Sequence, residues 1–189
     1  MRTEDDADET LMLRYRDGDA DAFAALYARH KGALYRYLLR QCGQPALAEE
    51  LFQDVWLKLI AARTGYTVQA RFTTYLYRLA HNRLIDHYRA SSRGLPLSYA
   101  EDCPAEWAEV PAPAEMQPEA QDDRRRQAER LLELLAELPE AQREAVLLKE
   151  EAGLSLEEIA QATGTGRETV KSRLRYAMAR LRQGLRGAR

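Results

Sequence analysis

The sequence predicts an all-α protein in which a flexible acidic linker joins two helical domains. Apolar residues recur every three or four positions in the first and last thirds of the chain, and this spacing places them on one face of a helix. No segment alternates apolar and polar residues between hairpin turns, as a strand would. Between the two helical parts, prolines interrupt an acidic, alanine-rich stretch, which is typical of an extended linker.

The N-terminal part predicts a run of helices separated by clear breaks. A glycine-containing turn at 17–19 precedes the first helix, and Pro45 suits the first turn of the second. Thr64-Gly65 and the β-branched residues after them indicate a loop before the third helix. The predicted helices cover about 20–41, 46–62 and 73–90.

The C-terminal part predicts further helices with sharper end signals. Pro139 ends the first of them. Ser155 and Glu158 form a capping box that begins a short helix, and Thr165 and Glu168 repeat this pattern before a basic helix. The expected ranges are about 122–138, 140–151, a short helix from 155 to the turn at 164–166, and a basic helix over about 166–184.

The formal net charge of −2 hides a division into basic, acidic and basic segments. Positions 71 to 93 contain five arginines and one acidic residue, and positions 98 to 123 contain eight acidic residues and no basic one. From position 167 to the end there are eight basic residues and one acidic residue. This layout indicates two polyanion-binding surfaces on either side of an acidic spacer.

Several classes of protein fit the sequence poorly. The mean hydropathy is −0.56, and the acidic N-terminus has no apolar segment, so we expect a cytoplasmic protein without membrane insertion. Cys42 and Cys103 form no paired motif. His30, His81 and His87 lack metal-ligand spacing, and no glycine loop suits a phosphate. We therefore expect no enzyme, with no catalytic residues, no metal and no cofactor.

The short capped helix, the glycine-containing turn and the basic helix together form a helix-turn-helix pattern. The first helix of such a motif supports the second, whose outward residues lie free for the DNA major groove. An ordinary basic hairpin within a helical bundle has the same pattern, but the charge layout favours nucleic-acid binding. The outward residues, rich in donors for bases and phosphates, are Arg167, Thr169, Lys171, Ser172, Arg173, Arg175 and Tyr176.

The predicted helix over 73–90 offers a second basic surface, on which aromatic residues lie between arginines. Exposed aromatic rings beside basic side chains suit the binding of single-stranded or unstacked DNA. The alternative is that about half of these rings face the helical core. The residues are Phe72, Tyr75, Tyr77, Arg78, Asn82, Arg83, Tyr88 and Arg89.

Three stretches of the chain resemble bacterial RNA polymerase sigma factors. The family's region 4 resembles LPEAQREAVLLKEEAGLSLEEIAQATGTGRETVKSRLRYAMARL, and the helix of its regions 2.3 and 2.4 resembles FTTYLYRLAHNRLIDHYR. Its region 2.2 helix resembles LAEELFQDVWLKL. Since the resemblance covers only these two domains, over about 10–92 and 125–186, the chain is similar to the extracytoplasmic-function (ECF) class.

The resemblance implies that 10–92 is region 2, 93–123 a flexible acidic linker and 124–189 region 4. It implies that region 2 binds core RNA polymerase and opens the −10 promoter element, while the region 4 helix-turn-helix reads the −35 element. The implied partners are core polymerase, through its β′ clamp helices and β flap, promoter DNA and an anti-sigma factor.

The resemblance also assigns roles to individual residues at matching positions. The residues expected to face core polymerase are Glu50, Gln53, Asp54, Trp56 and Leu57. The residues expected to open the −10 element and hold a flipped base are Tyr75, Arg78, Asn82 and Arg83, together with the loop at about 63–72. Those expected to read the −35 element are Arg167, Thr169, Lys171, Ser172 and Arg175.

Two other functions remain open on sequence grounds. A stand-alone helix-turn-helix regulator would dimerise and need no core polymerase, but it leaves the resemblance to region 2 unexplained. An enzyme acting on nucleic acid would need clustered acids for metal binding, whereas the acids here lie in the linker and on helix faces.

Overall fold

The computed structural model describes residues 6–91 and 118–186, with side chains described for 6–90 and 125–186. Every regular element within these ranges is a helix, which confirms the predicted all-α class. Most of the predicted linker, including Cys103, lies outside the described residues. Its last part is an exception, because the backbone is already helical from Pro118.

The N-terminal part consists of α1 (Asp8–Arg16), α2 (Ala20–Cys42), α3 (Pro45–Ala62), the short 3-10 turn η1 (Arg63–Gly65) and α4 (Phe72–Ser91). The ends of α2 and α3 follow the predicted signals. Asp19 caps α2 by accepting hydrogen bonds from the N–H groups of Asp21 and Ala22. Gly43 ends α2 in the left-handed conformation, with φ 70°, and Pro45 begins α3.

Helix α1 was not predicted, because its nine residues carry no clear apolar stripe. A helix this short is marginal by itself, so it depends on the surface against which it packs. Leu11, Met12 and Tyr15 are its buried residues, and α1 contacts α2 and α4. Tertiary packing therefore stabilises this helix.

The C-terminal part consists of α5 (Pro118–Ala136), α6 (Glu140–Glu150), α7 (Leu156–Thr163) and α8 (Arg167–Arg186). The predicted capping box of Ser155 and Glu158 is confirmed at the start of α7. The second predicted box is wrong. Helix α8 begins with Val170 N–H donating to Gly166 O, and the Thr165 hydroxyl lies 3.0 Å from that of Thr163 instead.

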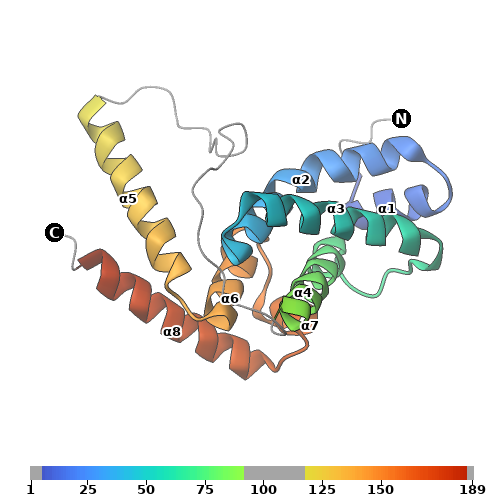
Figure 1. The fold of residues 1–189 in the computed structure, drawn as a ribbon. Coiled ribbons are helices and arrows are strands. Elements are labelled where there is room, and N and C mark those ends of the chain that lie inside the picture. Colours follow the sequence, from blue (N-terminus) through green and yellow to red (C-terminus); the bar gives the residue numbers. More distant parts are fainter. Residues whose placement is uncertain (1–5, 92–117, 187–189) are drawn as a thin grey trace.

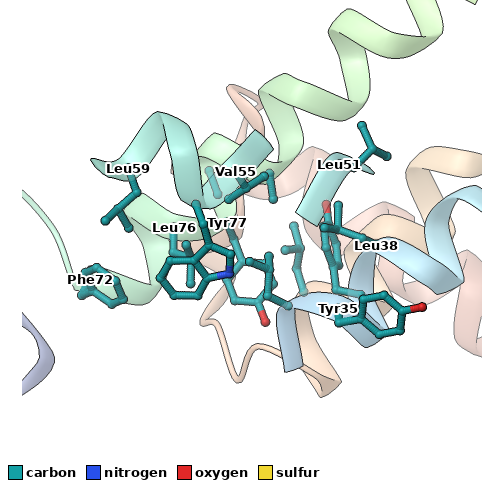
Figure 2. Packing of buried hydrophobic residues seen from close by; sticks show 14 of the residues in the cluster. Tyr35, Leu38, Leu51, Val55, Leu59, Phe72, Leu76 and Tyr77 are labelled. Atoms are coloured by element: carbon teal, nitrogen blue, oxygen red, sulfur yellow. The ribbon is translucent and has the colours of Figure 1, made fainter. Parts of the chain in front are cut away.

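The main core lies between α2, α3 and α4 and is rich in aromatic rings (Figure 2). Tyr37, Phe72 and Tyr77 are among its fully buried side chains. The same cluster continues into α6 and α7 through Leu147, Leu148 and other residues. A smaller core joins α5, α6 and α8, and consists of Leu134, Leu135, Leu138, Val146, Ala177 and Leu181.

The two helical parts therefore pack directly on each other. Helix α7 contacts α4 and helix α6 contacts α2, while α5 and α8 extend to one side of the molecule (Figure 1). The sequence patterns predicted two tethered domains and gave no sign of this docking. The contacts join residues far apart in the chain, which local periodicity does not report.

Candidate nucleic-acid interface

Helix α3 presents a polar outer face with one exposed leucine. Glu50 and Gln53 are exposed, Asp54 is half-buried, and 61% of Leu57 is exposed. Acidic groups around an isolated apolar side chain suit a partner surface that is basic at its edges and apolar at its centre.

The structure corrects the prediction for Trp56, whose side chain does not lie on this face. Only 4% of Trp56 is exposed. Its ring contacts those of Phe23, Tyr27 and Phe52, with centroid distances of 5.8, 5.0 and 6.2 Å. One step along a helix turns a side chain by about 100°, which separates the buried Trp56 from the exposed Leu57. Trp56 therefore supports α3 from inside the core.

Arg83 of α4 lies between two predicted surfaces. Its Nε donates to Asp54 Oδ2 at 2.6 Å, and one terminal nitrogen donates to Glu50 Oε1 at 3.2 Å. The Arg83 side chain is only 17% exposed. It therefore faces α3, while Tyr75, Arg78 and Asn82 follow a different line along α4. Of the four predicted −10 residues, the structure sets Arg83 apart from the other three.

A cavity of about 460 Å³ opens between η1, the following loop and α4. Tyr75 and the exposed Arg78 line it from α4, and Gln161 lines it from α7. The remaining lining residues, which include most of the predicted −10 loop, are Ala62, Thr64, Gly65, Tyr66, Thr67, Gln69, Ala70 and Thr74.

Aromatic rings line the cavity, and two unpaired hydroxyl groups lie buried behind its surface. The rings of Tyr66 and Tyr75 lie at 62° to each other with centroids 5.3 Å apart. The buried Tyr66 hydroxyl and Thr74 Oγ1 have no hydrogen-bond partner among the described side chains and backbone. Burial raises the pKa of Tyr66 to about 12, so its hydroxyl stays protonated. Aromatic rings at a cavity suit a flat heterocycle, and Arg78 suits a nearby phosphate.

Helix α8 divides cleanly into an inner and an outer face. Val170, Ala177 and Leu181 are buried against the neighbouring helices. Of the predicted −35 residues, Ser172 is half-buried. The exposed ones are Arg167, Thr169, Lys171 and Arg175. The predicted inward and outward orientations of α8 thus agree with the structure.

Neighbouring groups hold the cations of α8 in place. Arg167 pairs with Glu157 of α7 and with Glu168, and Lys171 Nζ lies 3.7 Å from Glu168 Oε2. The hydrogen bond to Glu157 raises the pKa of Arg167, which remains charged. Arg175 Cζ lies 5.1 Å from the ring centroid of Tyr176, which is 55% exposed. These pairs are exposed, so they weaken readily when a phosphate competes.

Local sequence patterns did not single out three of the residues that complete the cavity. Tyr66, Thr74 and Gln161 lie within the stretches that resemble the family or in the predicted −10 loop, but no individual role was predicted for them, and Gln161 comes from a different domain. Among the described residues, no group of three or more His, Cys, Asp or Glu side chains is placed to hold a metal. None of the helices in the searched part of the chain has the length and apolar character needed to cross a membrane.

Comparison with protein families gives matches over both helical parts. Residues 26–94 match sigma-70 region 2, and residues 128–181 match sigma-70 region 4. The RNA polymerase sigma factor CarQ of Myxococcus xanthus is 33% identical over 172 residues, covering 91% of this chain and 94% of CarQ. The ECF RNA polymerase sigma factor BldN of Streptomyces coelicolor is 31% identical, covering 90% of this chain and 62% of BldN.

Solved structures share the fold. CnrH, solved in complex with the cytosolic domain of CnrY, gives a TM-score of 0.68 at 22% identity, covering 96% of this chain and 99% of CnrH. RpoE of Bartonella quintana, solved with the anti-sigma factor NepR, gives the same TM-score and identity, covering 90% of this chain and 100% of RpoE. Matches to both family regions, together with a relative similar over nearly its full length, place the chain in the ECF class of RNA polymerase sigma factors, which direct the polymerase to promoters.

Proposed function

We propose that this sigma factor binds core RNA polymerase through α3, opens the −10 element at the cavity beside α4, and reads the −35 element with α8. The observation that carries the proposal is the aromatic cavity, with Arg78 at its edge, in the same chain as the exposed basic face of α8. A regulator that only binds duplex DNA needs the basic face of α8 and has no use for the aromatic cavity.

The α3 face is the proposed polymerase contact. Glu50, Gln53, Asp54 and Leu57 form it, and Trp56 supports it from below. Carboxylates steer this face toward basic residues of the β′ clamp helices, and Leu57 supplies the apolar centre that such interfaces use. Region 4 would contact the β flap.

The cavity beside α4 is the proposed site for an unpaired base of the −10 element. Stacking on an aromatic side chain contributes about 1–3 kcal/mol per base, which offsets part of the cost of unpairing DNA. Tyr75 supplies the ring, Tyr66 packs against it, and Arg78 and Asn82 lie exposed along the same helix as Tyr75, where they can contact the DNA backbone.

We also propose that an anti-sigma factor regulates this chain in the cytoplasm, and that its role is binding without catalysis. CnrH and RpoE, which share its fold, were solved in complexes, RpoE with an anti-sigma factor. Pull-down of the chain from cells of its host, with release of the captured protein by added core polymerase, tests this part of the proposal.

Run-off transcription tests the proposed function as a whole. Purified core polymerase is given a library of promoter-containing DNA, with and without the protein. New start sites that depend on the protein, preceded by shared −10 and −35 sequences, are the expected result. If the chain bound duplex DNA specifically and failed to bind core polymerase, the stand-alone regulator would replace the sigma factor.

Arg175→Ala is expected to weaken binding of the holoenzyme to promoter duplex by about 1–3 kcal/mol and to relax the preference for one −35 base. Lys171→Ala is expected to weaken binding to all sequences and to lower the slope of log affinity against log salt by about one. Fluorescence anisotropy across a salt series measures both. Arg126→Ala, which removes an exposed arginine of α5, is the charge-matched control and should leave binding unchanged.

A further inference from the structure

Helix α1 contacts the segment that leads into the loop of the cavity beside α4. The guanidinium group of Arg63 in η1 lies over the ring of Tyr15, with Arg63 Cζ 5.5 Å from the ring centroid. Arg16 Nη1 donates to the backbone oxygen of Tyr66, the first residue after η1, at 3.5 Å. The last turn of α1 therefore lies against the start of the loop that lines the cavity.

The first turn of α1 holds the other end of the same loop. Glu9 Oε1 accepts a hydrogen bond at 2.6 Å from the backbone N–H of Phe72, the first residue of α4. The first N–H groups of a helix have no partner within it, so a side chain commonly caps them. Ala70 and Arg71, which precede α4, have no acceptor atom in their side chains. Glu9 thus caps α4 from 63 positions away, and its charge suits the positive end of the helix dipole.

A neighbouring carboxylate fixes α1 on α2. Asp8 Oδ1 accepts a hydrogen bond from Arg29 at 2.7 Å, and Asp8 Oδ2 lies 2.7 Å from His30 Nε2. The centroid of the His30 ring lies 5.2 Å from that of Phe72. Because Asp8 and Glu9 are adjacent in α1, the pairs that anchor α1 also set the position of the Glu9 carboxylate at the start of α4.

The groups beside Glu9 are the aromatic rings of the cavity. Tyr75, the ring proposed to stack on a −10 base, lies in the first turn of α4, where its N–H donates to Arg71 O at 3.2 Å. Its ring packs against that of the buried Tyr66. Burial raises the pKa of Tyr66, and the charge of Glu9 raises it further. The Glu9 carboxylate therefore lies near both the start of α4 and the Tyr66 ring.

We propose that Glu9 is a positioning residue for the −10 site, which holds Tyr66 and Tyr75 in the geometry that selects one unpaired base. Glu9 acts through the cap of α4, without contact to the base. A rigid site discriminates between bases by their fit, whereas a site that can rearrange accepts several. This inference rests on the proposed function, and it adds that the base preference of the cavity depends on α1.

Hydrogen exchange of the free protein tests the cap without polymerase. Glu9→Ala removes the carboxylate, and Glu9→Gln keeps an acceptor oxygen at the same place. Asp21→Ala, the matched control, removes an exposed carboxylate from the first turn of α2. Since a lost cap costs a helix end about a factor of five, we expect the amides of Phe72 and Tyr75 to exchange about fivefold faster in Glu9→Ala only.

Transcription from a promoter series tests the consequence for base choice. Four duplex promoters differ only at the −10 base for which the unaltered holoenzyme shows the strongest preference, and initial run-off rates give the ratio of the best base to the other three. We expect Glu9→Ala to lower this ratio about threefold, because the coupling can be no larger than the free energy of the cap. Glu9→Gln should restore most of the ratio, and Asp21→Ala should leave it unchanged.

The ratio separates positioning from a general loss of stability. A variant that was only less stable would lose all four rates by one factor and keep its ratio. An unchanged ratio in Glu9→Ala, or equal ratios in Glu9→Ala and Glu9→Gln, overturns the proposal. Faster exchange in Glu9→Ala, with no protein-dependent transcription even by the unaltered chain, would instead keep the cap and overturn the sigma-factor function.

Discussion

Trp56→Ala is expected to lower the free energy of unfolding of the N-terminal domain by about 3–5 kcal/mol, because it empties a site that aromatic rings surround. Phe23, Tyr27 and Phe52 would lose their shared contact, and the cavity left behind is too enclosed to collapse fully. Urea denaturation followed by circular dichroism measures the loss. A protein of this size has a total stability of order 5–15 kcal/mol, so much of the variant would unfold at growth temperature.

Leu57→Ala, one residue further, is the matched comparison. Its side chain is 61% exposed, so the free energy of unfolding should change by no more than about 0.5 kcal/mol. Its affinity for core polymerase should fall by about 1–2 kcal/mol, roughly 5- to 30-fold, if Leu57 is the apolar centre of the interface. Competition with the unaltered protein for core polymerase measures this loss of affinity. Equal stability losses in the two variants, or full polymerase affinity of Leu57→Ala, would contradict the assignment of the α3 face.

The contrast between Trp56 and Leu57 shows what a family motif predicts and what it does not. The motif predicts that α3 exists, and its periodicity predicts an inner and an outer face. It does not separate a residue that binds the partner from one that shapes the binding helix, because both are needed for the same activity. Burial separates them, and burial depends on Phe23 and Tyr27 in a different helix.

End signals predicted the helices well where the signal was local. Pro45, Pro139 and the Ser155 capping box each mark a helix start or end that the structure confirms. Thr165 fails as a cap because its hydroxyl turns toward Thr163, and α8 begins one residue later than that cap requires. Two stretches with the same Ser/Thr-x-x-Glu pattern thus differ in whether the hydroxyl group caps the helix.

The cavity and the contact between the two helical parts lay beyond prediction for a different reason. Gln161 reaches a wall built by the loop after η1, and Glu144 meets Tyr37 across 107 positions of sequence. No motif or periodicity links such residues. The charge layout indicated an acidic spacer between two basic surfaces and gave no sign that acidic residues of α6 and α7 would contact the N-terminal domain.

Tyr75→Ala is expected to reduce run-off transcription from duplex promoters by about 5- to 150-fold, which corresponds to the 1–3 kcal/mol of one lost base stack. Tyr75→Phe keeps the ring and should retain most of the activity. On a template with the −10 region already unpaired, Tyr75→Ala should regain most of its activity, because the polymerase no longer needs that stacking energy to open the DNA. Initial rates on the two templates provide the measurement.

The comparison between templates separates melting from folding. Tyr75 is half-buried against Tyr66, so its loss also removes an internal ring contact, and a thermal melt of each variant records that cost. A variant damaged only in its fold would lose activity on both templates in the same proportion. A variant that had lost polymerase binding would do the same, and it would also compete poorly for core enzyme. Only a residue that stabilises an unpaired base gives a large defect on duplex DNA and a small one on the opened template, and that pattern is the one the cavity beside α4 predicts.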